Sequence, residues 1–207
     1  MAEKRYKKSE ITREKILEVA EEHFAEKGFF GARVDEIADS ADVNKRMLYS
    51  HFGSKEGLYT AVLVKTYKRL AEFEKHFIIE GIDPIASIRN IVLTSFRFLS
   101  QNPNFVRMLL WENLNMAKSV PRDELSRLKA PSLEYMREQI RRGKEQGIFR
   151  ADADEFHTVF SLMNLCFSYF SNIHTMSAML SRDMTADEEV ISRAEYISDV
   201  IIKYLEP

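Results

Sequence analysis

The sequence of 207 residues predicts an all-α fold, and composition and periodicity both support this. Seven glycines and five prolines leave few chain breaks, while the good helix formers Leu, Ala, Glu, Lys, Arg and Met dominate. Apolar residues recur at the three-to-four-residue spacing of amphipathic helices. With 45% hydrophobic residues, the chain can bury a sizeable core, in one large domain or two small ones.

Four helices are predicted in the first part of the chain, over residues 12–28, 34–41, 44–51 and 54–77. Gly28 ends the first, because glycine tolerates the left-handed conformation of a helix C′ residue. Asn44 and Ser54 carry side-chain oxygens that can cap the third and fourth helices. The second and third helices are short and joined by a tight turn, which makes them a helix-turn-helix candidate.

Five or six further helices follow, and no segment predicts a strand. They begin at Asp83 with Pro84, at Asn102 with Pro103, at residues 122 and 132, at Asp152 or Asp154, and at residue 185. Pro131 is expected to separate the two helices over residues 122–129 and 132–147. The next helix should end near Ile173, and Thr185 with Glu188 should form a capping box for the last, which runs to Leu205.

The helix-turn-helix candidate presents hydrogen-bond donors on one side. Ala38 is the small residue where two helices cross closely, and four apolar residues lock the pair together: Val34, Ile37, Val43 and Leu48. Burial of Leu48 turns Arg46, Tyr49 and Ser50 outward, with Lys45 at the margin. Such donors on a slim helix suit base edges and phosphates in the major groove of DNA.

The run from "AEKGF" to "SKEGLY" resembles the tetracycline-repressor (TetR) family of transcription regulators. The matching residues are Gly28, Phe29, Val34, Ile37, Ala38, Ala41, Val43, Leu48, Tyr49, His51, Phe52, Ser54, Lys55, Glu56 and Leu58. The sequence departs from the family pattern in three respects. Asp42 replaces the glycine of the turn, Asn44 replaces a serine, and Ala32 with Arg33 replaces a hydroxyl before Val34. Asp42 tolerates the left-handed region better than most residues, so the turn should survive.

The resemblance implies three regions: an amino-terminal arm with a three-helix helix-turn-helix DNA-binding domain (1–54), a connecting helix (55–80), and a larger helical ligand-binding and dimerisation domain (81–207). The predicted DNA-contacting residues are Arg33, Asn44, Lys45, Arg46, Tyr49, Ser50, His51 and Lys55. Alternatively, Lys45, Arg46 and Lys55 form a solvated charged face, and Tyr49 and His51 pack the third helix against the first. A basic arm with Lys4, Arg5, Lys7 and Lys8 either reaches the minor groove or is disordered.

For the carboxyl-terminal domain, the resemblance implies a small-molecule pocket. Aromatic and methionine walls with a few polar groups are typical of such pockets. The candidates are Phe96, Met108, Trp111, Asn115, His157, Phe160, Asn164 and Phe167. For each Phe or Met taken alone, the favoured alternative is a place in the helical core, whereas Asn115, His157 and Asn164 would need polar partners if buried.

An apolar stripe on the last helix predicts a dimer interface, because the family pairs such helices between two copies. Its residues are Val190, Ile191, Ile197, Val200, Ile201 and Tyr204. The alternative is packing within the chain. A dimer would place two recognition helices about one DNA turn apart, which suits a palindrome.

Other classes find less support in the sequence. The single cysteine, Cys166, lies among apolar residues and is expected to be a buried thiol. The five histidines show no metal-ligand spacing, so no metal or other cofactor is expected. No phosphate-binding loop or catalytic triad motif supports an enzyme. Without a signal peptide or an apolar run of roughly 20 residues, the chain is expected to be cytoplasmic and not to bind membranes.

The sequence therefore predicts a ligand-responsive transcription regulator, a repressor rather than an activator. Its expected partners are double-stranded operator DNA of palindromic sequence, an unidentified small-molecule effector and a second copy of the chain. The alternative is a helical DNA- or protein-binding module that works without an effector. A net charge of −2 does not oppose DNA binding, because the distribution of charge decides.

Overall fold

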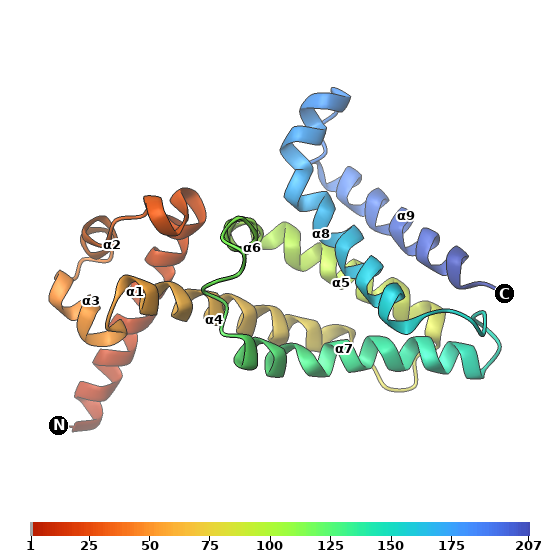
Figure 1. The fold of residues 1–207 in the computed structure, drawn as a ribbon, viewed down its shortest axis with the longest axis horizontal. Coiled ribbons are helices and arrows are strands. Elements are labelled where there is room, and N and C mark those ends of the chain that lie inside the picture. The colour runs from red at the N-terminus through yellow and green to blue at the C-terminus, as the bar shows by residue number, and fades with distance from the viewer. Residues whose placement is uncertain (1) are drawn as a thin grey trace. The chain divides into compact units, whose positions relative to one another are not determined.

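The computed structural model describes residues 2–207, with side chains described from Ser9 onward (Figure 1). The predicted all-α class is confirmed, and the described residues contain no strand. The helices are α1 (Ala2–Gly31), α2 (Val34–Ser40), α3 (Lys45–Phe52), α4 (Lys55–Glu74), the 3₁₀ helix η1 (Lys75–Phe77), α5 (Pro84–Gln101), α6 (Pro103–Leu114), α7 (Arg122–Glu145), α8 (Glu155–Leu180) and α9 (Asp187–Leu205). The predictions for the side chains of Lys4, Arg5, Lys7 and Lys8 lie outside the described residues.

The chain divides into two compact units. Unit 1 comprises Met1–Lys68 and Arg107–Leu125, and unit 2 comprises Arg69–Val106 and Ser126–Pro207. Helices α4, α6 and α7 each supply residues to both units. Residues 107–125, which the sequence assigns to the carboxyl-terminal domain, thus group with the amino-terminal helices.

Unit 1 is built around the apolar sides of α1 to α4. Its buried core includes Ile16, Leu17, Phe24, Ile37, Leu48, Leu58, Val62 and Leu63, with Met108 added from α6. The rings of Phe24 and Phe29 meet the ring of Tyr59 edge to face, at 4.8 and 5.2 Å between centroids. These contacts fix the start of α4 against the end of α1.

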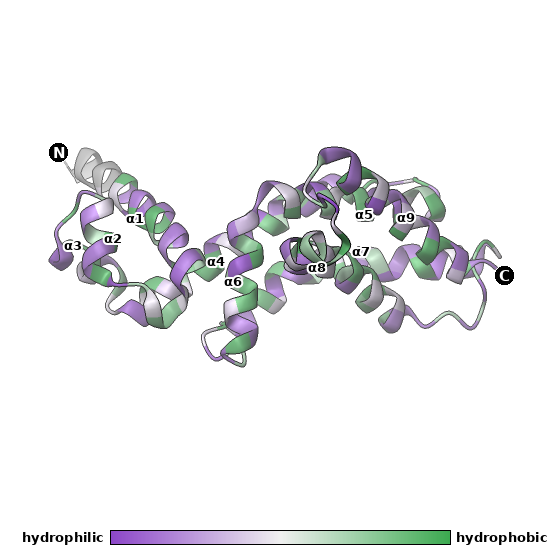
Figure 2. Cartoon of the chain, turned by 90° about the horizontal axis from the view of Figure 1, so that it is seen from above, coloured by the Kyte–Doolittle hydropathy of each residue, from purple (hydrophilic) through white to green (hydrophobic). Residues whose placement is uncertain are grey.

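Unit 2 is organised around α5, which packs against α8, α9 and η1. Figure 2 shows hydrophobic (green) and hydrophilic (purple) residues interspersed along its helices. The ring of Phe96 contacts Tyr169 and Phe170 of α8, and the ring of Phe98 contacts Phe73 and Phe105. Lys129 forms a buried ion pair with Glu74. Burial lowers the pKa of Lys129, and the attraction of the Glu74 carboxylate offsets only part of this effect.

Several predicted helix ends are confirmed by their hydrogen bonds. Asn44 accepts from the backbone N–H of Met47 at 2.8 Å, Ser54 from Gly57 at 3.1 Å, and Asp154 from His157 at 2.7 Å. Asp83 accepts from two backbone N–H groups at 3.0 Å, directly before Pro84.

Other boundaries differ from the predictions. Helix α1 begins at Ala2 rather than Thr12 and runs past a kink at Gly28. Helix α7 continues through Pro131 as one helix, where the Ser132 hydroxyl donates to the Lys129 carbonyl in the interrupted turn. The predicted break is therefore wrong, because packing over both halves outweighs the hydrogen bond that proline removes.

The end of α8 and the start of α9 also differ. Helix α8 extends beyond Ile173 to Leu180, and α9 begins after Ala186, which makes no side-chain cap. The predicted capping box at Thr185 is wrong because the Thr185 hydroxyl donates to the Asp183 carboxylate at 2.6 Å instead. Among the described residues, no helix is long and apolar enough to cross a bilayer.

Candidate DNA-binding site

The turn between α2 and α3 has the hydrogen bonds of a helix that ends in the left-handed region. Asp42 adopts φ 53°, which confirms that it replaces glycine in this conformation. Its backbone N–H donates to the carbonyl of Asp39, and that of Val43 donates to the carbonyl of Ala38, each at 3.0 Å. This pair of bonds satisfies the last carbonyls of α2 and turns the chain sharply into α3.

Helix α3 is held in place by one deeply buried residue. Leu48 lies fully inside the core of unit 1, with Ile37 and Ala38 of α2 buried beside it. The small side chain of Ala38 permits the close crossing that the sequence predicted. Because Leu48 points inward, the opposite side of α3 faces solvent.

That opposite side carries three of the predicted DNA contacts. Arg46, Tyr49 and Ser50 are all exposed, and so is Met47, which is not among the predicted DNA contacts. Helical geometry could have indicated Met47, because adjacent residues lie about 100° apart around the helix and Leu48 is buried. The face thus combines a guanidinium, two hydroxyls and a thioether that can contact a thymine methyl.

Lys45 lies at the edge of this face and is engaged within the protein. Its ammonium forms an ion pair with the Asp35 carboxylate of α2 at 2.7 Å. The hydrogen bond to Asp35 raises the pKa of Lys45, so the side chain stays charged. A phosphate at this point would compete with Asp35 for the ammonium group.

The first turn of α4 is capped by Ser54 and carries a further cation, Lys55. The Ser54 hydroxyl accepts a hydrogen bond from the Gly57 N–H. The pKa of the Glu56 carboxyl is lowered by hydrogen bonds from the Glu56 backbone N–H and from the Ser54 side chain. The ammonium of Lys55 lies 4.8 Å from the centre of the Phe29 ring, a cation–π contact that orients a half-buried side chain.

The remaining predicted DNA contacts lie at the borders of the motif. Arg33 is exposed at the N-cap of α2 and makes no side-chain cap. Asn44 is exposed but caps α3, so its carbonyl oxygen is engaged. His51 is half-buried, with its ring 6.0 Å from that of Phe52.

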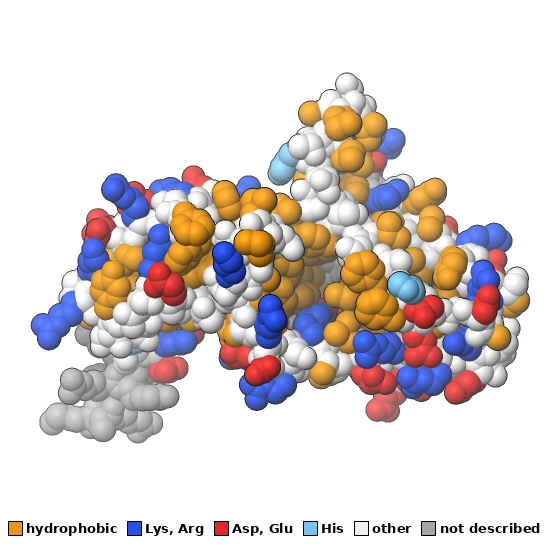
Figure 3. Space-filling model, in the orientation of Figure 1, with side chains coloured by type: hydrophobic (Ala, Val, Ile, Leu, Met, Phe, Trp, Pro, Cys, Tyr) orange, Lys and Arg blue, Asp and Glu red, His pale blue; other side chains and the backbone are white. Residues whose placement is uncertain are grey.

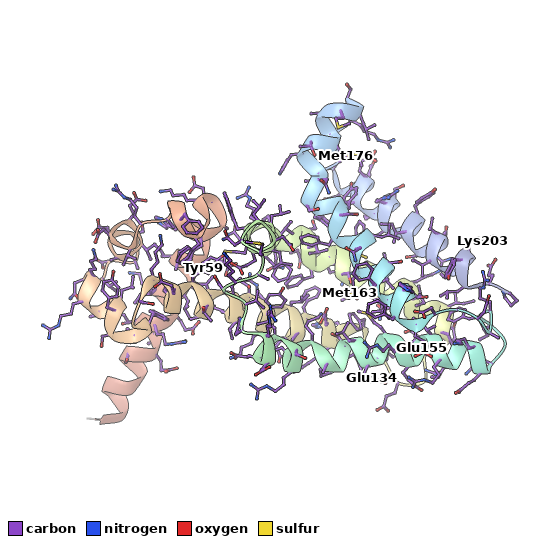
Figure 4. All side chains as sticks on the ribbon, in the orientation of Figure 1. Tyr59, Glu134, Glu155, Met163, Met176 and Lys203 are labelled. Carbon is purple, nitrogen blue, oxygen red and sulfur yellow. The ribbon has the colours of Figure 1, made fainter. Side chains whose placement is uncertain are left out.

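Helix α6 attaches to the helix-turn-helix unit through Trp111. The indole N–H donates to the Ala25 carbonyl at 3.2 Å, where the kink of α1 at Gly28 leaves that carbonyl available. Glu112, the next residue of α6, is buried and accepts the Ser119 N–H at 3.3 Å. Burial and Glu112 together raise the pKa of Tyr59, whose position on α4 is labelled in Figure 4.

The eight predicted pocket residues do not form one set. Met108, Trp111 and Asn115 belong to unit 1, whereas Phe96, His157, Phe160, Asn164 and Phe167 belong to unit 2. Met108 is fully buried in the core of unit 1. Asn164 is exposed, and its amide donates to the Phe160 carbonyl of its own helix at 2.8 Å. Its polar group therefore needs no ligand.

Unit 2 does contain a groove of about 320 Å³ between α5 and α9. Phe96 is the predicted pocket residue that lines it. His157 and Phe160 are exposed on α8, where Phe160 stacks on Phe156 at 6.0 Å between ring centres. Hydrophobic side chains gather on the visible face of unit 2 in Figure 3.

The predicted dimer stripe on α9 divides between inside and outside. Ile197 and Ile201 lie in the core of unit 2, so this part of the prediction is corrected: they are not available to a second copy. Ile191, Val200 and Tyr204 are exposed and Val190 is half-buried. Tyr196, which is not part of the predicted stripe, is exposed as well, because a residue one turn before Val200 shares its side.

Two family models match the chain. Residues 16–62 match the bacterial regulatory proteins of the tetR family, and residues 84–201 match the tetracyclin repressor-like C-terminal domain. The HTH-type transcriptional repressor NicS of Pseudomonas putida is 31% identical over 202 residues, covering 97% of this chain and 95% of NicS. The HTH-type transcriptional repressor SCO4008 of Streptomyces coelicolor is 30% identical over 141 residues, or 67% and 68% of the two chains.

The fold also matches solved structures. The structure of SCO4942 from Streptomyces coelicolor superposes with a TM-score of 0.72 at 23% identity, covering 95% of this chain and 99% of that one. At this identity the likeness concerns the fold alone.

Proposed function

Because the chain belongs to the tetracycline-repressor family of transcription regulators, we propose that it is a repressor whose homodimer binds a palindromic operator and is released by a small molecule. Its family and its relatives are DNA-binding regulators and not enzymes. The operator, the dimer and the effector are the parts that belong to the proposal.

The observation that carries the proposal is the exposed face of α3. Arg46, Tyr49 and Ser50 lie on the exposed side of α3, opposite Leu48, and the start of α4 adds Lys55. Arg46 would read a guanine edge, because a guanidinium donates two parallel hydrogen bonds. Lys45, Lys55 and Arg33 would bind phosphates and set the register of the protein on the duplex.

Support for a dimer comes from apolar side chains that unit 2 leaves in water. On α9 these are Tyr196, Val200 and Tyr204, and on α8 they are Phe156, Phe160 and Met163. A second copy would cover such a surface, since large exposed apolar patches mark interfaces. Two copies joined there would present two α3 helices to the two half-sites of a palindrome.

Support for a ligand response comes from helices shared by the units. Helices α4, α6 and α7 each contribute to both units, and α6 is fastened to α1 by Trp111. A ligand that favours one arrangement of unit 2 would change operator affinity through these helices. Its effect is limited by its differential affinity for the two states, typically about 1–3 kcal/mol.

Recovery and sequencing of the DNA bound to the tagged protein in cells would test the proposal. We expect a palindromic site with half-sites about one DNA turn apart. On that site, Arg46→Ala should weaken binding by about 1–3 kcal/mol and relax the preference at one base pair. Arg137→Ala, which removes an exposed guanidinium from α7, serves as the control. Equal binding by wild type and Arg46→Ala would sink the assignment of the reading face.

Effector release needs a separate measurement. Small molecules that dissociate the protein from the operator can be screened by fluorescence anisotropy. The effector-independent alternative would be supported if the protein bound its operator, no compound dissociated it and unit 2 bound none of the compounds.

A further inference from the structure

The groove between α5 and α9 is a shaped surface within unit 2. The carboxyl-terminal half of α5 supplies Leu93, Phe96 and Arg97, and the first turns of α9 supply Asp187, Val190 and Ile191. Its volume of about 320 Å³ lies at the lower end for small-molecule sites, which suits a ligand of amino-acid size.

The floor of the groove is apolar and firmly held. Phe96 is 2% exposed, and its ring contacts Tyr169 and Phe170 at 5.5 and 5.2 Å between centroids. Leu93 and Ile191 border the floor with 42% and 56% of their surface exposed. An apolar body in the groove would remove these side chains from water, which favours its binding.

The two walls carry opposite charges that do not satisfy each other. Arg97 of α5 and Asp187 of α9 are both exposed, and neither has an ion-pair partner in the part of the chain that the structure describes. The same two helices do form such a pair elsewhere, between Arg89 and Asp199 at 2.7 Å. A guanidinium on one wall and a carboxylate on the other complement a ligand with an anionic and a cationic end.

The groove also lies apart from the proposed dimer surface. Asp187, Val190 and Ala194 recur at helical spacing on the side of α9 that faces α5. Tyr196 and Val200 fall on another side of that helix and are exposed there. A dimer joined through the latter side leaves the groove open.

We infer that this groove binds a small zwitterion with an apolar body. Arg97 would bind its carboxylate, Asp187 would bind its ammonium group, and the body would lie on Phe96 between Leu93 and Ile191. Binding does not depend on the proposed repressor function; only the consequence, release from an operator, would rest on it.

Three probes of equal body separate the two charges: phenylalanine, 3-phenylpropionate without the ammonium group, and 2-phenylethylamine without the carboxylate. Methyl NMR of the full chain, without DNA, would report binding through the signals of Leu93 and Ile191. We expect phenylalanine to bind tightest, with each singly charged probe about fivefold weaker, as expected for exposed ion pairs of about 1 kcal/mol.

Four variants locate the charges. Arg97→Gln should weaken phenylalanine and 3-phenylpropionate but not 2-phenylethylamine, and Asp187→Asn should weaken phenylalanine and 2-phenylethylamine only. Arg89→Gln and Asp199→Asn remove the same charges from the same two helices outside the groove, and should leave all three affinities unchanged.

Three results would overturn the inference. The first is binding of phenylalanine that Arg97→Gln and Asp187→Asn leave unaltered, and the second is no methyl shift with any probe. The third is a change in sedimentation with Arg97→Gln alone, which would make a second copy of the chain the occupant. None of these results touches the repressor proposal, because operator binding is measured separately on the same variants.

Discussion

The indole ring of Trp111 covers Gly28 so closely that a Cβ atom on Gly28 would lie 2.8 Å from the Trp111 Cδ2 atom. Gly28 also adopts φ 67°, a conformation that side chains disfavour. Two independent constraints therefore require glycine at the kink of α1, and one of them comes from α6. The contact fixes the direction in which the chain leaves α1 for the helix-turn-helix.

Gly28→Ala should destabilise the protein more than a glycine substitution with the same backbone cost. Gly81 is the matched control, because it has φ 74° with nothing within 4 Å of its added Cβ. We expect about 1 kcal/mol for Gly81→Ala and about 2–4 kcal/mol for Gly28→Ala, measured by urea unfolding. Equal losses would show that the contact with Trp111 yields at little cost.

Asp35→Asn should strengthen DNA binding. The substitution releases the Lys45 ammonium from its 2.7 Å ion pair and removes a negative charge that repels phosphate. A gain of about two- to fivefold is expected for an exposed pair, measured by fluorescence anisotropy at fixed salt. Asp39→Asn on the same helix makes the same charge change without freeing Lys45. If the two variants gained equally, the ion pair would have no specific role.

Structural features that depend on residues close together in the chain could be predicted from the sequence. Asn44 and Ser54 cap their helices through residues three positions ahead, and the exposure of Arg46 follows from the burial of Leu48 two residues later. Helical period and capping chemistry decide such features, so they can be read without knowing the fold.

Contacts between segments that are far apart in the sequence could not be predicted from local patterns. The Trp111 indole N–H donates to a carbonyl 86 residues away, and no local sequence pattern predicts such a contact. Likewise, helical periodicity places Ile197 and Val200 in one apolar stripe, but it does not show that Ile197 faces the core of unit 2 and Val200 faces solvent. The continuation of α7 through Pro131 depends on tertiary packing, which outweighs local preference.

Cys166 should resist thiol reagents until the protein unfolds. Burial raises the pKa of its thiol to about 12, so the reactive thiolate is scarce at pH 8. Above about pH 8.5 the unfolded chain releases this proton while the folded chain keeps it, so stability should fall as pH rises from there toward 12. Labelling with a chromogenic disulfide at pH 8 in increasing urea should follow the unfolding transition. Rapid labelling in the absence of urea would contradict the buried position.

The same substitution at two neighbouring positions of α9 should have opposite consequences. Ile197 is 1% exposed, so Ile197→Glu places a carboxylate in the core of unit 2 and should cost more than about 4 kcal/mol, enough to unfold the chain.

Val200 is 41% exposed, so Val200→Glu should leave the melting temperature within a few degrees of wild type. Where two copies meet on the side of α9 that carries Tyr196 and Tyr204, however, two glutamates would be buried against an apolar partner. The variant should then sediment as a folded monomer and lose operator affinity, because each half-site would be bound singly. A folded, dimeric Val200→Glu would move the interface to another surface, and a stable Ile197→Glu would contradict the packing of α9 itself.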